Sequence, residues 1–142
     1  MDATKAAEQA AAAALLGLAG LHAVWASGSS WPAEDRDALA DLMAGRAEGS
    51  APSPAACLTV ATLLAGASAL VAGRPERLPW LRRSGSAVVS LVLGVRGACG
   101  MAGRTDLVSP GSTSPRFRRL DRRYYSPLCL LLAAGAASSA RT

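Results

Sequence analysis

The stretch AACLTVATLLAGASALVA, residues 55–72, indicates the fold, because it runs for 18 residues without a charged side chain. An α-helix needs about 17–25 apolar residues to cross a hydrocarbon core of about 30 Å. Elsewhere in the chain the charges also fall in blocks, which are separated by long apolar stretches. This segregation is typical of a membrane protein, whereas a water-soluble domain spreads its charges along amphipathic elements.

Three further runs of this kind cover residues 10–26, 86–102 and 124–140, each 17 residues long. The last run is the weakest, because two serines and Arg141 follow soon after its Leu-rich start. Together the four runs predict an all-α fold, a four-helix transmembrane bundle. We expect residues 1–142 to form one multi-pass domain in the cell membrane.

The charges do not fix the orientation of this bundle. With four spans, the side that holds both termini carries six Lys and Arg, and the other side carries eight. The positive-inside rule therefore favours the side with eight as cytoplasmic only slightly. A cleaved signal peptide is the alternative for the first run, and Asp2 and Glu8 in its leading region argue against it.

The segments between the runs contain helix signals. Over Pro32–Ala44, a proline followed by three acids is typical of a helix start, and Gly45 is typical of a helix stop. We predict a short amphipathic helix here, on the membrane interface. A loop is expected over residues 46–54, and a short connection over Arg74–Arg83, with Trp80 as an interface anchor.

Small residues predict close packing between the spans. Glycines recur at three-residue spacing in the first run, at Gly17 and Gly20. They recur in the same way along the third run, at Gly94, Gly97, Gly100 and Gly103. In lipid, such faces let helix backbones approach closely, and dispersion then drives the association.

The composition excludes several classes of protein. The 15 Lys and Arg outnumber the 10 Asp and Glu, but they flank apolar runs without a recognition helix or stacking platform, so nucleic-acid binding is not expected. The three cysteines lie in three different runs and form no CxxC pair, which favours buried apolar roles for Cys57, Cys99 and Cys129. The chain has one histidine and no close carboxylate pair in the spans, so no metal site is expected. It also has no phosphate-binding loop, so no cofactor is expected.

One charged residue lies inside a span. Arg96 is near the middle of residues 86–102, where a charge costs at least about 2.5–3.5 kcal/mol on insertion scales. This makes Arg96 a functional-site hypothesis, facing inward with a partner. The alternative is that its side chain extends toward the nearer interface, roughly 10 Å away along the helix.

Other polar candidates lie at the ends of the spans. His22 and Trp25 share one helical face, although a lone histidine at a helix end is often only an interfacial residue. Asp121 is the only acid among five arginines, and it could pair with an arginine such as Arg96 or act as a general acid if desolvated. Two aromatic residues follow it, Tyr124 and Tyr125, for which anchoring at the interface is the commoner role.

Span parity predicts that these side chains meet. In a four-span bundle, the ends of the first and third runs and the start of the fourth lie on one membrane face. The residues expected there are His22, Trp25, Arg96, Asp121, Tyr124 and Tyr125. Beneath the interfacial helix they would form a polar cavity with an aromatic rim.

Several short motifs carry a resemblance to a known family. They are Leu21-His22-Ala23-Val24-Trp25, Trp31-Pro32, Val95-Arg96-Gly97, Phe117-Arg118-Arg119-Leu120-Asp121 and Tyr125-Ser126-Pro127-Leu128-Cys129. Through them the chain resembles the bacterial family called domain of unknown function 3995, small four-span membrane proteins common in actinobacteria. The resemblance covers roughly residues 12–138. It implies the topology and the number of spans, and it implies no activity.

Two hypotheses for the function follow. The first is a membrane-embedded pocket for a lipophilic molecule, with ligand contacts from Trp25, Trp31, Arg96, Tyr124 and Tyr125. In an enzymatic version, Asp121 or His22 would protonate an isoprenoid-like or quinone-like substrate in a cyclisation or isomerisation, and tryptophan ring faces would stabilise positive charge.

The second hypothesis is a non-catalytic protein. It would be an accessory subunit, a lipid-interacting scaffold or a small transporter component. Its basic loops and small-residue helix faces suit contact with membrane lipids, a partner membrane protein or a second copy of the chain.

Overall fold

The computed structural model describes residues 2–46 and 51–142, and the elements formed by these residues are all helical. Three of the helices are long and apolar enough to cross a membrane, namely α1 (Ala3–Ala26), α3 (Pro54–Val71) and α4 (Pro79–Met101). The fourth apolar run forms α6 (Ser126–Arg141), which has only 16 residues. The all-α prediction is therefore confirmed, and three of the four predicted spans correspond to helices of sufficient length.

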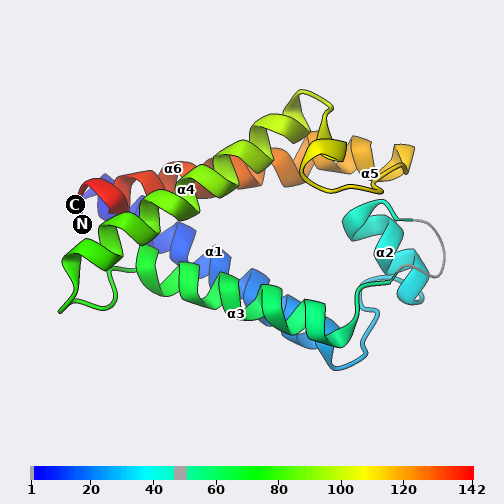
Figure 1. Ribbon diagram of the computed structural model, residues 1–142, viewed down its shortest axis with the longest axis horizontal. Helices are drawn as coiled ribbons and strands as arrows, with labels where there is room; N and C mark the ends of the chain where they lie inside the picture. Colours follow the sequence, from blue (N-terminus) through cyan, green and yellow to red (C-terminus); the bar gives the residue numbers. More distant parts are fainter. Residues whose placement is uncertain (1, 47–50) are drawn as a thin grey trace.

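The long helices form two antiparallel pairs (Figure 1). Helix α1 packs along α3, and α4 packs along α6. Both chain termini lie at one end of the molecule, where the pairs join through a core of Leu15, Val71, Leu132 and other buried residues. At the opposite end the pairs diverge, and α2 (Arg36–Ala44) lies between them.

Small residues on α4 and α6 allow the close packing that the glycine spacing predicts. A Cβ atom built on Gly97 would lie 2.7 Å from Leu130 Cγ and 2.9 Å from the Ser126 carbonyl oxygen. The prediction is wrong for Gly17 and Gly20, since a Cβ on either would meet nothing within 4 Å. These two glycines lie on an open face of α1.

Serine hydroxyls join the two helices of each pair. Ser68 Oγ on α3 donates to the Ala12 carbonyl oxygen of α1 at 2.7 Å, and Ser90 Oγ on α4 donates to the Ala133 carbonyl oxygen of α6 at 2.9 Å. A hydroxyl that donates to a carbonyl group across a helix interface needs no water as its hydrogen-bond partner, as a lipid environment requires. The hydrogen bonds therefore fix the register of each pair.

The predicted interfacial helix is present but starts later than expected. Helix α2 begins at Arg36 rather than at Pro32, because Asp35 is its N-cap and accepts a hydrogen bond from the Ala38 N–H at 2.7 Å. A side-chain acceptor at this position satisfies an otherwise unpaired donor of the first turn. Gly45 ends α2 as predicted, in the left-handed region at φ 63°.

The loop expected over residues 46–54 is confirmed for residues 46 and 51–53, whereas Pro54 already belongs to α3, with Ser53 as its N-cap. Residues 47–50 of this loop lie outside the described residues. Helix α4 begins at Pro79, so Trp80 belongs to its first turn rather than to a connection. Both helices begin at a proline, because proline is favoured in the first turn of a helix.

The segment between α4 and α6 leads directly into α6. It contains η1 (Thr105–Leu107), α5 (Pro115–Leu120) and the π-helical turn η2 (Asp121–Tyr125). Pro127 has no N–H to donate to the carbonyl group four residues earlier, and its ring would crowd that group in an α-helix. The wider π turn accommodates the proline at this point.

Candidate functional site

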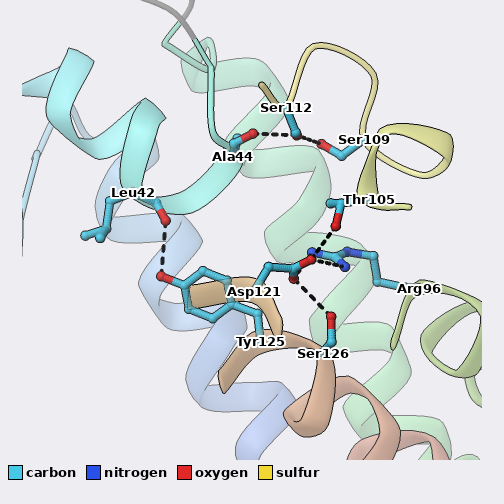
Figure 2. A network of polar contacts seen from close by, with 9 residues as sticks. All are labelled: Leu42, Ala44, Arg96, Thr105, Ser109, Ser112, Asp121, Tyr125 and Ser126. Atoms are coloured by element: carbon cyan, nitrogen blue, oxygen red, sulfur yellow. Dashed lines mark hydrogen bonds and ion pairs between the residues drawn. The ribbon is translucent and has the colours of Figure 1, made fainter. Parts of the chain in front are cut away.

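A buried carboxylate, Asp121, organises the polar contacts where α4 meets η2 (Figure 2). Its side chain is fully enclosed and forms an ion pair with Arg96. Arg96 Nη2 donates to Asp121 Oδ1 at 2.7 Å, and Nη1 lies 3.3 Å from Oδ2. Arg96 therefore has the inward-facing orientation and the partner that its position in the span predicts.

Two hydroxyls complete the coordination of this carboxylate. Thr105 Oγ1 donates to Asp121 Oδ2 at 2.6 Å, and Ser126 Oγ donates to Oδ1 at 3.1 Å. Each carboxylate oxygen thus accepts two hydrogen bonds, which is what a buried charge requires. We call Arg96, Thr105, Asp121 and Ser126 the Asp121 cluster.

The π turn is what brings Ser126 to Asp121. Residues five apart in an α-helix point about 140° away from each other, so the two side chains would diverge. In η2 the Ser126 N–H donates to the Asp121 carbonyl oxygen, and the wider turn places both side chains on one side. The π turn is therefore the reason that Ser126 belongs to the cluster.

Gly100 leaves the space between α4 and η2 that this cluster occupies. A Cβ atom at Gly100 would overlap Ser126 Oγ and would lie 2.7 Å from Asp121 Oδ2 and 2.9 Å from Arg96 Nη1. Only a residue without a side chain lets α4 approach η2 this closely. Gly100 is therefore part of the cluster's construction.

The contacts keep Asp121 ionised. Burial by itself raises the pKa of the Asp121 carboxyl, but the hydrogen bonds from Arg96, Thr105 and Ser126 and the charge of Arg96 outweigh that effect. The net result is a pKa below the usual value of 3.8. At neutral pH this carboxyl has no proton to donate.

A second group of polar and aromatic residues lies at the end of α1. The His22 and Trp25 rings meet edge to face, with centroids 4.8 Å apart. Trp25 Nε1 donates to the Trp31 carbonyl oxygen at 2.7 Å, and His22 Nδ1 lies 2.8 Å from the Leu18 carbonyl oxygen. Arg36 donates to the Trp25 carbonyl at 3.2 Å and to the Pro52 carbonyl at 2.8 Å.

These residues border a pocket of about 450 Å³ between α1, α2 and α3, which we call the α2 pocket. Its apolar surface comes from Trp25, Leu39, Met43, Cys57 and Val60. Its polar surface comes from His22, Arg36, Arg46 and Ser53. Small residues, Ala44, Ala51, Pro52 and Ala56, complete the lining. The pocket lining is thus mainly apolar and includes two cationic side chains, Arg36 and Arg46.

Helix α2 connects the α2 pocket to the Asp121 cluster. Tyr125 Oη donates to the Leu42 carbonyl oxygen at 3.1 Å, and Ser112 Oγ donates to the Ala44 carbonyl oxygen at 2.6 Å (Figure 2). A Cβ at Gly45 would lie 2.7 Å from Phe117 Cδ1, so the end of α2 rests directly on this buried ring. One side of α2 covers the pocket while its C-terminal end is fixed to the segment around η2.

Of the residues expected to form one cavity, four divide between these two groups. The ends of α1 and α4 and the start of α6 do lie at the same end of the molecule, as parity predicts (Figure 1). However, only His22 and Trp25 of the expected set line the α2 pocket, and Arg96 and Asp121 do not. The expectation of a single cavity was wrong because α2 lies between the two pairs of helices and separates the groups.

The remaining candidates have other surroundings. The Trp31 side chain is 65% exposed, and this residue contributes only its carbonyl oxygen to Trp25. Tyr124 is 55% exposed, with the Arg123 guanidinium 5.6 Å from its ring centroid. Tyr125 is half-buried and holds α2. Of the three, only Tyr125 has a clear structural role.

Thr105 and Ser126 of the Asp121 cluster, and the adjacent Gly100, were not predicted as site residues. Thr105 and Ser126 are ordinary hydroxyl residues, and Gly100 was expected only to pack a helix. The usable signal was the spacing of Asp121, Ser126 and Pro127, because a proline six residues after a buried acid favours a widened turn between them.

A family model described as "Protein of unknown function (DUF3995)" matches residues 15–136. The chain belongs to this family. The match covers most of the DUF3995 domain described above, from the core of α1 through the α2 pocket and the Asp121 cluster into α6. No curated protein and no solved structure matches this chain.

Proposed function

We propose that this DUF3995 protein is a multi-pass membrane protein that binds a lipophilic molecule with a polar head in the α2 pocket. The observation that carries the proposal is the lining of that pocket. Trp25, Leu39 and Val60 supply apolar surface, and Arg36 and Arg46 supply positive charge at the border. Mostly apolar pockets with a few placed polar groups are typical ligand sites.

The lining also limits the class of ligand. A volume of about 450 Å³ suits a molecule of moderate size, such as an isoprenoid-like or quinone-like compound. Arg36 is held by two backbone carbonyl groups, and Arg46 has no such restraint among the described residues. A ligand head that accepts hydrogen bonds, or carries negative charge, complements these guanidinium groups.

We further propose that α6 is the fourth span. It runs antiparallel along α4, with Ser90 joined to Ala133 and Ser86 Oγ 3.4 Å from Ser139 Oγ. Its 16 residues are slightly fewer than the about 17–25 of an ordinary span. A short span of this kind is tolerated where the bilayer thins locally or flanking residues extend to the interface.

A catalytic role for the same pocket would fall to His22. Of the two candidate acids, only His22 lines the pocket. Asp121 is fixed in an ion pair and has a lowered pKa, so we assign it the role of holding α4 to η2 rather than that of a proton donor. Loss of turnover of a lipophilic substrate in His22→Ala, with ligand binding retained, would test the enzymatic version.

The binding proposal itself can be tested with a matched pair of variants on α3. Ala55 and Ala56 are both exposed, but only Ala56 lines the α2 pocket. We expect Ala56→Leu to reduce the lipophilic molecules that remain with the purified protein, because the added side chain fills the pocket. Ala55→Leu should retain them. Equal retention by both variants, measured by mass spectrometry of solvent extracts, would contradict the proposal.

The second candidate function is a non-catalytic accessory subunit, and the open face of α1 favours it. Gly17 and Gly20 meet nothing within 4 Å, so another helix has room to approach there. Gly97 is unsuited to testing this idea, because it packs on Leu130 inside the chain. Loss of a co-purifying membrane protein in Gly17→Leu and Gly20→Leu variants that stay folded would support the accessory role.

A further inference from the structure

We propose that a second hollow, beside η1, binds a phosphate group. The hollow has a volume of about 490 Å³. It is lined by Gly103, Thr105, Arg118, Arg119, Arg122 and Arg123, and we call it the arginine hollow. It shares no lining residue with the α2 pocket, so the proposal does not depend on the function proposed there.

Among the residues that the structure describes, no acid pairs with the guanidinium groups of this hollow. Arg119 and Arg122 form no hydrogen bond or ion pair with any residue that the structure describes. Arg118 makes one long contact, 3.5 Å to the Thr113 carbonyl oxygen, and Arg123 lies over the Tyr124 ring. Four positive charges in one hollow repel each other, and a bound anion would offset that repulsion.

The nearby acids do not supply this anion. Asp121 belongs to the same helical segment, but its carboxylate is buried and saturated by Arg96, Thr105 and Ser126. Asp106 pairs with Arg104 at 3.7 Å and does not line the hollow. The charge of the hollow is therefore left for a ligand.

The backbone also shapes the hollow. Gly103 has φ of 74°, a conformation that side-chain-bearing residues rarely adopt. A Cβ atom there would lie 2.5 Å from Arg122 Nη2, so the glycine leaves room for this guanidinium to lie over the main chain. Arg122 thus lines the hollow while it remains exposed.

The guanidinium groups of the hollow suit a phosphate group better than a ligand with a single negative charge. Each guanidinium presents a planar fork of N–H donors that matches two phosphate oxygens. The hollow lies just beyond Met101, where α4 ends, and this is the depth at which lipid head groups meet a span. The phosphate could belong to an anionic lipid or to a free anion, and the chemistry that recognises it is the same.

A binding experiment with the full chain tests the site. Short-chain phosphatidate would be titrated into the protein in a zwitterionic detergent, with bound lipid measured by native mass spectrometry. We expect the double variant Arg119→Gln/Arg122→Gln to bind on the order of tenfold more weakly or worse, because charge-assisted hydrogen bonds are lost. The matched control is Arg74→Gln/Arg77→Gln, which removes the same charge from exposed positions in the α3–α4 connection.

The outcomes separate cleanly. Weaker binding in the first variant with unchanged binding in the control supports the site, and an equal change in both, or in neither, contradicts it. If the double variant misfolds, Arg119→Gln and Arg122→Gln singly provide the same comparison. Displacement by inorganic phosphate indicates a free anion as the source, and its failure to displace indicates the lipid. Equally tight binding of oleate, whose head is a carboxylate, contradicts the phosphate assignment.

Discussion

Arg96, in the C-terminal part of the apolar helix α4, donates at 2.7 Å to Asp121, a carboxylate that is fully buried at the start of η2. The pair joins α4 to η2, and through η2 to the segment that holds α2 over its pocket. An unpaired charge at either position would be costly in lipid, and the ion pair lowers that free-energy cost for both residues.

Removing the carboxylate should destabilise the protein strongly. Asp121→Ala leaves Arg96 without its partner, and breaking such a pair costs about 3 kcal/mol, the low end of the usual range because the Arg96 side chain is 25% exposed. The free energy of unfolding in mixed micelles measures this. The double variant Arg96→Met/Asp121→Ala should recover much of the loss. Additive losses in the double-mutant cycle would show that the two residues do not interact.

The same pair predicts how stability depends on pH. The pKa of Asp121 is lowered from its usual value of 3.8, so its contribution to stability is complete above that value. The contribution is lost as pH falls further, through the lowered pKa of the folded state. Wild type should therefore lose stability below pH 3.8 by more than Asp121→Asn does, in thermal unfolding followed by circular dichroism. Parallel curves for the two proteins would be incompatible with the ion pair.

Adding one methyl group at Gly100 should disturb the cluster. Gly100→Ala would push its Cβ against Ser126 and Asp121, and such overpacking costs about 1–3 kcal/mol. Gly17→Ala is the matched control, since it lies inside α1 with open space around it. We expect no loss there, because alanine favours a helix over glycine by about 1 kcal/mol. Equal effects of the two substitutions on unfolding would refute the close packing at Gly100.

The tyrosine hydroxyl that holds α2 should affect local opening more than global stability. Tyr125→Phe removes the donor to the Leu42 carbonyl oxygen, a hydrogen bond worth about 1 kcal/mol. Backbone amides of α2 should then exchange with solvent about fivefold faster. Tyr124→Phe changes an exposed ring with no hydrogen bond among the described contacts and is the control. Unchanged exchange in Tyr125→Phe would exclude this role.

The parts of the fold that sequence predicts well depend on local patterns. Apolar runs place α1, α3 and α4 within a few residues at their C-terminal ends, and an arginine in the middle of a span predicts a buried partner. The start of α3 is predicted within one residue, but the starts of α2 and α4 are predicted less well, because Asp35 caps α2 and Pro79 starts α4 before its apolar run.

The site is predicted less completely, for a physical reason. Which side chains meet depends on how the helix pairs diverge and on the π turn at Asp121, and neither is encoded in a short window of sequence. Parity correctly places His22 and Asp121 at one end of the molecule. It cannot show that α2 separates them, because the position of α2 depends on distant contacts such as Tyr125 to Leu42.

The central claim is that the α2 pocket binds a lipophilic molecule, and Trp25 offers the most direct test. Its ring lines the pocket and is 6% exposed. With Trp31→Phe and Trp80→Phe, Trp25 becomes the only fluorescent tryptophan in the chain. A dibrominated fatty acid titrated into this protein should quench Trp25 saturably, and the further change Ala56→Leu should abolish that saturable quenching. Quenching that never saturates, or that is the same in Ala56→Leu, would contradict the claim.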